Sequence, residues 1–196
     1  MKKILLIALL VAAVGCKGKK SENASVADMK WEKIEVEDLQ MRPVAAFDKD
    51  WMALAAGNSS RFNAMTISWG TIGELWNKPV VIVYVSSDRA TKKLMDENKY
   101  FTVSAFPSSA KESLVYIGSH SMKDEPDKVA AAGLTAEFSP LGNPMFKEAC
   151  LTIECRKIYA EPFKEELLPD DVRPRYEKMG MHTAYIGEIV NVWEKE

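Results

Sequence analysis

The feature that most constrains this chain is a series of short segments rich in β-branched and aromatic residues, most of which alternate apolar with polar positions. Such segments predict strands. The predicted strands cover residues 33–39, 50–57, 62–70, 79–87, 100–106, 149–161 and 183–196. Helical periodicity is found only at residues 90–98, 108–118 and 126–133. So many strands with so few helices favour an antiparallel barrel or sandwich over a doubly wound sheet.

Local signals also predict how these elements end. Ser109 and Glu112 have the spacing of a capping box at the start of the second helix. Gly118 and Gly133 stand where glycine commonly ends a helix. The Pro and Gly residues of 139–144 predict an exposed loop.

The first sixteen residues have the pattern of a targeting signal. Two lysines precede an apolar run from Ile4 to Gly15, which small residues and Cys16 close. The run is too short to cross a bilayer comfortably. It resembles a bacterial lipoprotein signal, in which Cys16 carries the lipid; a plain cleavable signal and a buried helix are the alternatives. We therefore expect a signal at 1–16, a flexible tether at 17–30, a folded domain at 31–196, and a lipid-anchored location in the cell envelope.

Charge and cysteine content exclude several classes of function. The chain has 26 Lys and Arg against 28 Asp and Glu, which argues against nucleic acid as a partner. Cys150 and Cys155 lie in one predicted strand, on opposite faces and about 16 Å apart, so they cannot pair with each other. With only His120 and His182 besides, the sequence predicts no metal site.

The stretch 63–70 divides into two unlike faces. The large apolar face holds Met65, Ile67 and Trp69, and the small face holds Ala64, Thr66, Ser68 and Gly70. A half-buried strand normally presents longer polar residues on its second face, because that face meets water. A face this small lets a flat ring lie against the backbone.

Residues 85–93 follow a strongly apolar strand and begin a helix. The first N–H groups of a helix have no partner within it and attract a phosphate. Arg89 could add a charge-assisted contact, and the Thr91 hydroxyl a further hydrogen bond. The alternative is that Asp88 caps the helix and Arg89 is a solvated surface charge. Combined with the small-faced strand, this helix start describes a site for flavin mononucleotide (FMN).

The common nucleotide and hydrolase motifs are absent: there is no Gly-x-Gly-x-x-Gly after a strand, no P-loop and no Gly-x-Ser-x-Gly. Instead, the segment from about Trp51 to Trp193 resembles the flavin reductase-like family. The matching residues are Asp50-Trp51, Ala56-Gly57, Asn63 to Gly70, Trp76 to Pro79, Arg89 to Thr91, Tyr100 to Ser104, Gly118 to Ser121, Asp127-Lys128, Glu154 to Lys157 and Tyr185 to Val190. One departure is Met122-Lys123, where relatives commonly carry Gly-Arg.

The resemblance implies a mainly β, FMN-binding split barrel with a few helices, usually a homodimer. It assigns the segment containing Asn63, Met65, Thr66, Ile67, Ser68 and Trp69 to the flavin ring. It assigns Arg89 and Thr91 to the phosphate, Ser104 and Ser119 to the border of the flavin, and His182 to the nicotinamide side as a catalytic residue. For His182, the alternative is a partly buried histidine at a strand start with no catalytic role.

Three functions follow from these expectations. The first is an FMN-dependent oxidoreductase that takes electrons from a reduced donor such as NAD(P)H. The second is a lipid-anchored electron carrier that a membrane partner reduces, because NAD(P)H should be scarce outside the inner membrane. The third is a lipoprotein that uses the barrel to hold haem or another flat ligand.

Overall fold

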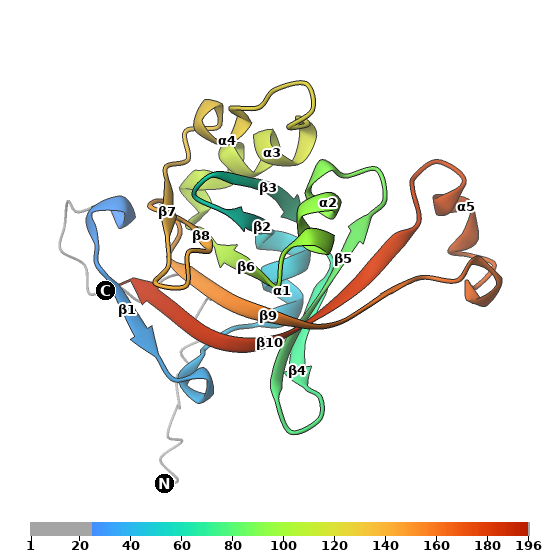
Figure 1. Cartoon of the computed structure of the whole chain (residues 1–196), viewed down its shortest axis with the longest axis horizontal. Helices are drawn as coiled ribbons and strands as arrows, with labels where there is room; N and C mark the ends of the chain where they lie inside the picture. Colours follow the sequence, from blue (N-terminus) through green and yellow to red (C-terminus); the bar gives the residue numbers. More distant parts are fainter. Residues whose placement is uncertain (1–24, 196) are drawn as a thin grey trace, which may run out of the picture.

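The computed structural model describes residues 25–195 (Figure 1). Its strands are β1 (Trp31–Ile34), β2 (Met52–Asn58), β3 (Arg61–Ile67), β4 (Gly70–Glu74), β5 (Pro79–Ser86), β6 (Tyr100–Ala105), β7 (Ala136–Phe138), β8 (Pro144–Phe146), β9 (Leu151–Pro162) and β10 (His182–Lys195). Its α-helices are α1 (Pro43–Ala45), α2 (Ala90–Glu97), α3 (Lys111–Ser119), α4 (Lys128–Ala131) and α5 (Arg173–Tyr176). Cys16 and the expected signal lie outside the described residues.

Short helical turns complete the chain: η1 (Val26–Asp28), η2 (Val36–Asp38), η3 (Ala46–Asp50), η4 (Ser108–Ala110) and η5 (Glu165–Leu167). Of the expected tether, residues 25–30 are described; they contain η1, whose Val26 carbonyl accepts a hydrogen bond from Lys195 Nζ at 3.0 Å. No helix in the described part of the chain has the length and hydropathy needed to cross a bilayer.

Eight strands form one antiparallel sheet, ordered β3-β2-β6-β9-β10-β5-β4, with β1 also paired to β10. β3 and β4 are the two ends of this order, yet only Ser68 and Trp69 separate them along the chain. Because so short a link must be spanned, the sheet curls until its ends approach each other, which produces an incompletely closed barrel.

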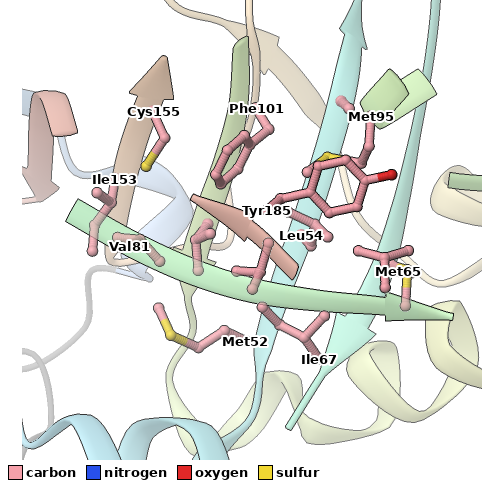
Figure 2. Packing of buried hydrophobic residues seen from close by; sticks show 14 of the residues in the cluster. Met52, Leu54, Met65, Ile67, Val81, Met95, Phe101, Ile153, Cys155 and Tyr185 are labelled. Carbon is pink, nitrogen blue, oxygen red and sulfur yellow. The ribbon is translucent and has the colours of Figure 1, made fainter. Parts of the chain in front are cut away.

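The barrel is filled by alternate side chains of its strands (Figure 2). Met65 and Ile67 of β3 point into this cluster, together with Phe101 of β6, Tyr185 of β10 and Met95 of α2. Each fully buried large apolar side chain contributes about 1.5–3 kcal/mol by leaving water. Met65 and Ile67, from the large face of residues 63–70, are therefore part of the barrel core.

The small face of β3 is covered by helix α3. Ala64 is fully buried in a second cluster with Leu114 and Ile117 of this helix. Thr66 Oγ1 donates a hydrogen bond to the Leu114 carbonyl. A Cβ on Gly118 would lie 3.0 Å from that of Thr66, so the helix backbone approaches the strand closely. The small residues Ala64 and Thr66 therefore permit tight helix packing. Ser68 is exposed, and Gly70 begins β4, where an added Cβ would meet the Phe47 ring.

The predicted strands are found in the structure, with two corrections. The strand expected at 62–70 ends at Ile67, because the chain turns at Ser68 and Trp69 and Gly70 begins β4. Residues 33–39 were expected to form a strand, but β1 ends at Ile34 and Val36–Asp38 form the turn η2. β1 pairs with β10 only as far as Val192, and β5 pairs with the same strand as far as Glu188. Little of the edge of β10 remains for a longer β1. Strands β4, β7 and β8 were not predicted.

Two predicted helix signals are wrong and one is confirmed. Helix α3 begins after Ala110 with no side-chain cap, so Ser109 and Glu112 form no capping box there. It continues through Gly118 to Ser119, so that glycine does not end it. Gly133 follows α4 with a φ of +75°, the left-handed conformation expected of a glycine that ends a helix.

The loop at residues 139–144 is anchored to the sheet instead of being fully exposed. Ser139 and Asn143 are buried, and both donate hydrogen bonds to the carboxylate of Glu154, the second from Nδ2 at 2.6 Å. Glu154 is itself fully buried on β9 and accepts a third hydrogen bond from Asn191 Nδ2 at 2.6 Å. A buried carboxylate requires such donors, so it holds the loop inward.

Candidate functional site

Four parts of the chain meet at one end of β5. This strand ends at Ser86, which pairs with His182 at the start of β10. Helix α2 begins just beyond, at Ala90. Trp69, in the link between β3 and β4, lies against His182 with ring centroids 5.0 Å apart.

His182 is the most deeply buried titratable residue of this group, with 7% of its surface exposed. The Trp69 ring contacts it with the centroids 5.0 Å apart, and Tyr176 makes an edge-to-face contact with it at 5.6 Å. Burial lowers the pKa of His182, the nearby Arg89 lowers it further, and Asp88 partly opposes both. The imidazole is therefore neutral near pH 7. Its Nδ1 is buried and has no hydrogen-bond partner among the described residues.

The start of α2 has no side-chain cap. Its N-cap residue is Arg89, whose Nη1 donates to the Gly118 carbonyl at 2.7 Å while the residue remains exposed. The Asp88 carboxylate instead accepts the Gly180 N–H at 2.7 Å, so it does not cap the helix as the simpler alternative required. The helix start remains able to accept an anion, with a guanidinium beside it.

Thr91 and Asn63 form a buried pair beneath this helix start. Asn63 Nδ2 donates to Thr91 Oγ1 at 2.8 Å, and both residues are almost fully buried. Asn63 Oδ1 has no partner. Thr91 therefore positions the helix against β3, and an exposed ligand could meet its backbone N–H more readily than its hydroxyl.

Lys128 adds a second cation that the sequence did not single out for a function. Its Nζ donates to the carbonyls of Ile117 and His120, each at 2.8 Å, at the end of α3. Burial lowers its pKa to about 8, with Arg89 adding to the decrease and Glu125 opposing it. A buried lysine is unusual enough to indicate a special contact, but which groups it meets depends on the tertiary fold.

The predicted site residues fall into two sets. Trp69, Arg89, Thr91 and His182 gather at the end of β5, and Ser119 follows the glycine that Arg89 contacts. Asn63, bonded to Thr91, and the exposed Ser68 adjoin this set. Four residues face elsewhere: Met65 and Ile67 lie in the barrel core, Thr66 lies under α3, and Ser104 is fully buried with its hydroxyl 2.9 Å from that of Thr152. Tyr176 joins the first set although no pattern in residues 163–181 pointed to it.

The geometry describes an open, partly apolar surface with a neutral imidazole at one side and an anion-attracting helix start at the other. Ser68, Trp69 and Arg89 keep it accessible to solvent. Within residues 25–195, no group of three His, Cys, Asp or Glu side chains could hold a metal ion.

Comparison with known proteins gives a consistent answer. The family model "Flavin reductase like domain" matches residues 47–196. A solved FMN-binding domain of a flavin reductases-like enzyme from Shewanella baltica OS155 is 14% identical, with a TM-score of 0.61 over 85% of this chain and 78% of its own. Flavoredoxin from Methanosarcina acetivorans is 22% identical, with a TM-score of 0.59 over 84% and 76%.

Flavoredoxin of Desulfovibrio vulgaris (Miyazaki F) is 23% identical, with a TM-score of 0.60 over 77% of this chain and 72% of its own. At these identities the likeness shows the fold. Among curated proteins, none matches the chain.

Proposed function

This chain belongs to the flavin reductase-like family, and from that premise we propose that it is an FMN-binding oxidoreductase that passes electrons from a reduced donor through the flavin to an acceptor. The predicted family and the mainly β split-barrel fold are confirmed by the domain match and by the similar structures. The observation that carries the proposal is the uncapped start of α2, with Arg89 beside it, adjoining the surface formed by Trp69 and His182.

The residues present fit FMN. A phosphate at the start of α2 would meet the free N–H groups and the guanidinium of Arg89. Ser68 and Trp69 offer an exposed edge for the ring, and the Trp69 ring packs against His182, whose buried Nδ1 has no hydrogen-bond partner among the described residues. The orphaned nitrogen is the kind of group that a ligand satisfies.

When bound, FMN supplies the electron chemistry, and the protein supplies binding and orientation. Arg89, whose exposed guanidinium donates to the Gly118 carbonyl, would hold the phosphate. The neutral imidazole of His182 can hold or accept a proton at a ring nitrogen without first losing one. Trp69 packs against the imidazole and limits its rotation.

The electron donor distinguishes two forms of this function. In the first, NAD(P)H reduces the flavin and the protein is an enzyme in its own right. In the second, a membrane partner reduces it and the protein is a carrier; the lipoprotein-like start of the sequence supports this form. Mixing FMN-loaded protein with NADH or NADPH in an anaerobic stopped-flow cell separates them, because rapid bleaching of the flavin contradicts the carrier.

Two further features belong to the proposal. We place the domain at the bacterial cell envelope, held by lipid on Cys16, because of the signal pattern in residues 1–16. We also expect a homodimer, as is usual in the family, since the surface around Trp69 is open and a second copy could cover it. Sedimentation equilibrium that finds only monomer in the presence of FMN would count against the dimer.

The central experiment compares FMN with riboflavin, which has the same ring and no phosphate. FMN should bind and its fluorescence should change, with riboflavin binding more weakly. Arg89→Ala should weaken FMN by roughly 10- to 150-fold, corresponding to about 1.5–3 kcal/mol for a hydrogen bond to a charged group. It should leave riboflavin nearly unchanged.

Lys93→Ala is the matched control, because Lys93 is an exposed cation on the same helix. It should alter neither affinity. A wild-type protein that takes up neither ligand refutes the flavoprotein function. Equal losses of FMN and riboflavin in the Arg89 variant would mean that Arg89 does not act on the phosphate.

A further inference from the structure

The segment between β9 and β10 forms an arm of residues 163–181 that carries η5 and α5. Figure 1 shows it projecting beyond the sheet, with α5 near its outer end. The arm lies beside the candidate site because β10 begins with His182, directly after it.

The two ends of the arm are fixed to the barrel. Phe163 N–H donates to the His182 carbonyl at 2.8 Å. At the other end, Gly180 N–H donates to Asp88 and its carbonyl accepts from Ser86 Oγ at 3.0 Å. A Cβ on Gly180 would lie 2.1 Å from Ser87 Oγ, so this end is closely packed.

The middle of the arm is held differently. Where residues 164–178 make hydrogen bonds and ion pairs in the described structure, the partners lie within the arm, as in the contacts of Arg173 with the Leu168 carbonyl at 3.0 Å and with Asp170 at 3.4 Å. The ring contact between Tyr176 and His182 connects this middle part to the barrel. An aromatic edge contact is worth about 0.5–1.5 kcal/mol, which thermal motion can break readily.

We propose that Tyr176 is a gate residue, which packs edge-to-face with His182 and restricts access of the second substrate to this histidine and to the flavin beside it. The inference rests on the proposed function only for the flavin; the cover over His182 stands on geometry alone. Among the described residues, Trp69, which is 39% exposed, and Tyr176 are the two aromatic rings that contact the imidazole. Arms fixed at both ends and loosely attached in the middle commonly open and close over a site.

The gate is tested first without flavin, through the reactivity of the two histidines toward diethylpyrocarbonate. His120 is exposed and provides an internal reference in every sample. In Tyr176→Ala, the rate at His182 relative to His120 should rise about tenfold, measured by peptide mass spectrometry. Tyr176→Phe keeps the ring and should leave the ratio unchanged.

Leu167→Ala, at an exposed position of the same arm, should also leave the ratio unchanged. Near-ultraviolet circular dichroism verifies folding; if the alanine variant is unfolded, Tyr176→Leu replaces it and is judged in the same way. A ratio that stays at the wild-type value in a folded variant without the ring overturns the gate.

A second measurement uses the FMN-loaded protein. Quenching of the bound flavin's fluorescence by acrylamide should become severalfold more efficient in Tyr176→Ala than in Tyr176→Phe, at equal FMN affinity. The two hypotheses fail separately. Absence of bound FMN refutes the proposed function while the histidine experiment still decides the gate, whereas bound FMN with unchanged quenching contradicts the gate alone.

Discussion

At the residue scale, His182 connects sequence, burial and chemistry most directly. The sequence predicted a histidine near the substrate or, alternatively, one buried at a strand start with no role. The structure combines features of both: the ring is buried against Trp69, and its Nδ1 is left without a partner. A buried polar nitrogen without a hydrogen bond is costly, so a function for it is the more economical explanation.

The pH dependence of stability provides a test of this environment. The folded-state pKa of His182 is lowered, so the unfolded chain, whose histidine titrates near 6.5, binds the proton first as the pH falls. The histidine therefore lowers stability as the pH falls through about 6.5 towards its lowered folded-state pKa, and it adds little to the slope well above pH 6.5. His182→Gln should flatten the slope between pH 7 and 5 in urea unfolding.

His120→Gln is the appropriate control for this experiment, because that side chain is exposed. Its pH profile should follow the wild type. Identical slopes in the wild-type protein and in His182→Gln would show that the imidazole is not desolvated as described.

At the element scale, the contrast between the two faces of β3 shows how packing uses residue size. One face supplies large side chains to the barrel, and the other accepts the backbone of α3 so closely that Thr66 bonds to it. Strand β10 packs equally closely at Gly187, which lies next to a shift in its register with β9. The contact between α3 and β3 and the close packing at Gly187 both depend on two elements coming together, so neither could be read from a single strand.

Gly187→Ala should destabilise the protein because the added Cβ has no room. It would lie 2.5 Å from the Phe101 ring and 2.7 Å from Cβ of Cys155. Overpacking of this kind costs about 1–3 kcal/mol. The free energy of unfolding in urea measures it.

Gly73→Ala is the matched control on another strand of the same sheet. A Cβ there meets nothing within 4 Å, so its stability should stay within about 0.5 kcal/mol of the wild type. If both variants were equally stable, the close packing of β10 against Phe101 would be contradicted.

At the scale of the whole molecule, the barrel lies close in sequence to the proposed lipid anchor. The packed domain is reached early in the chain: η1 follows Ser25, and β1 pairs with β10 from Trp31. Cys16 precedes Ser25 by nine residues, a span of at most about 30 Å when extended. A lipid on Cys16 would therefore keep the domain close to the membrane surface.

Cys16→Ser should release the protein from the membrane. Expressed in a bacterial host with a palmitate analogue, the wild-type chain should be labelled and should sediment with membranes, whereas the variant should be neither. Cys155→Ala, which removes a buried free thiol, should remain labelled and membrane-bound. Persistent labelling of Cys16→Ser would refute the anchor.

The sequence by itself determined the longer strands β2, β3, β5, β6, β9 and β10, because period-two alternation and apolar runs are local properties of a strand. It also predicted a phosphate contact at Arg89 and Thr91, since a strand that ends in polar residues before a helix exposes backbone N–H groups wherever it lies. The family resemblance then gave the barrel and the cofactor, and it predicted a role for His182 that stays a prediction. The resemblance covers most of the chain, and the fold is confirmed.

Only the tertiary structure decided what meets what. Helix α3 occupies the small face of β3 although about 45 residues separate Thr66 from the helix. The contacts of His182 with Trp69 and Tyr176 join parts of the chain that no periodicity relates. The sequence gives the size of each side chain. Which element packs against a small side chain depends on the path of the whole chain, and therefore on long-range packing.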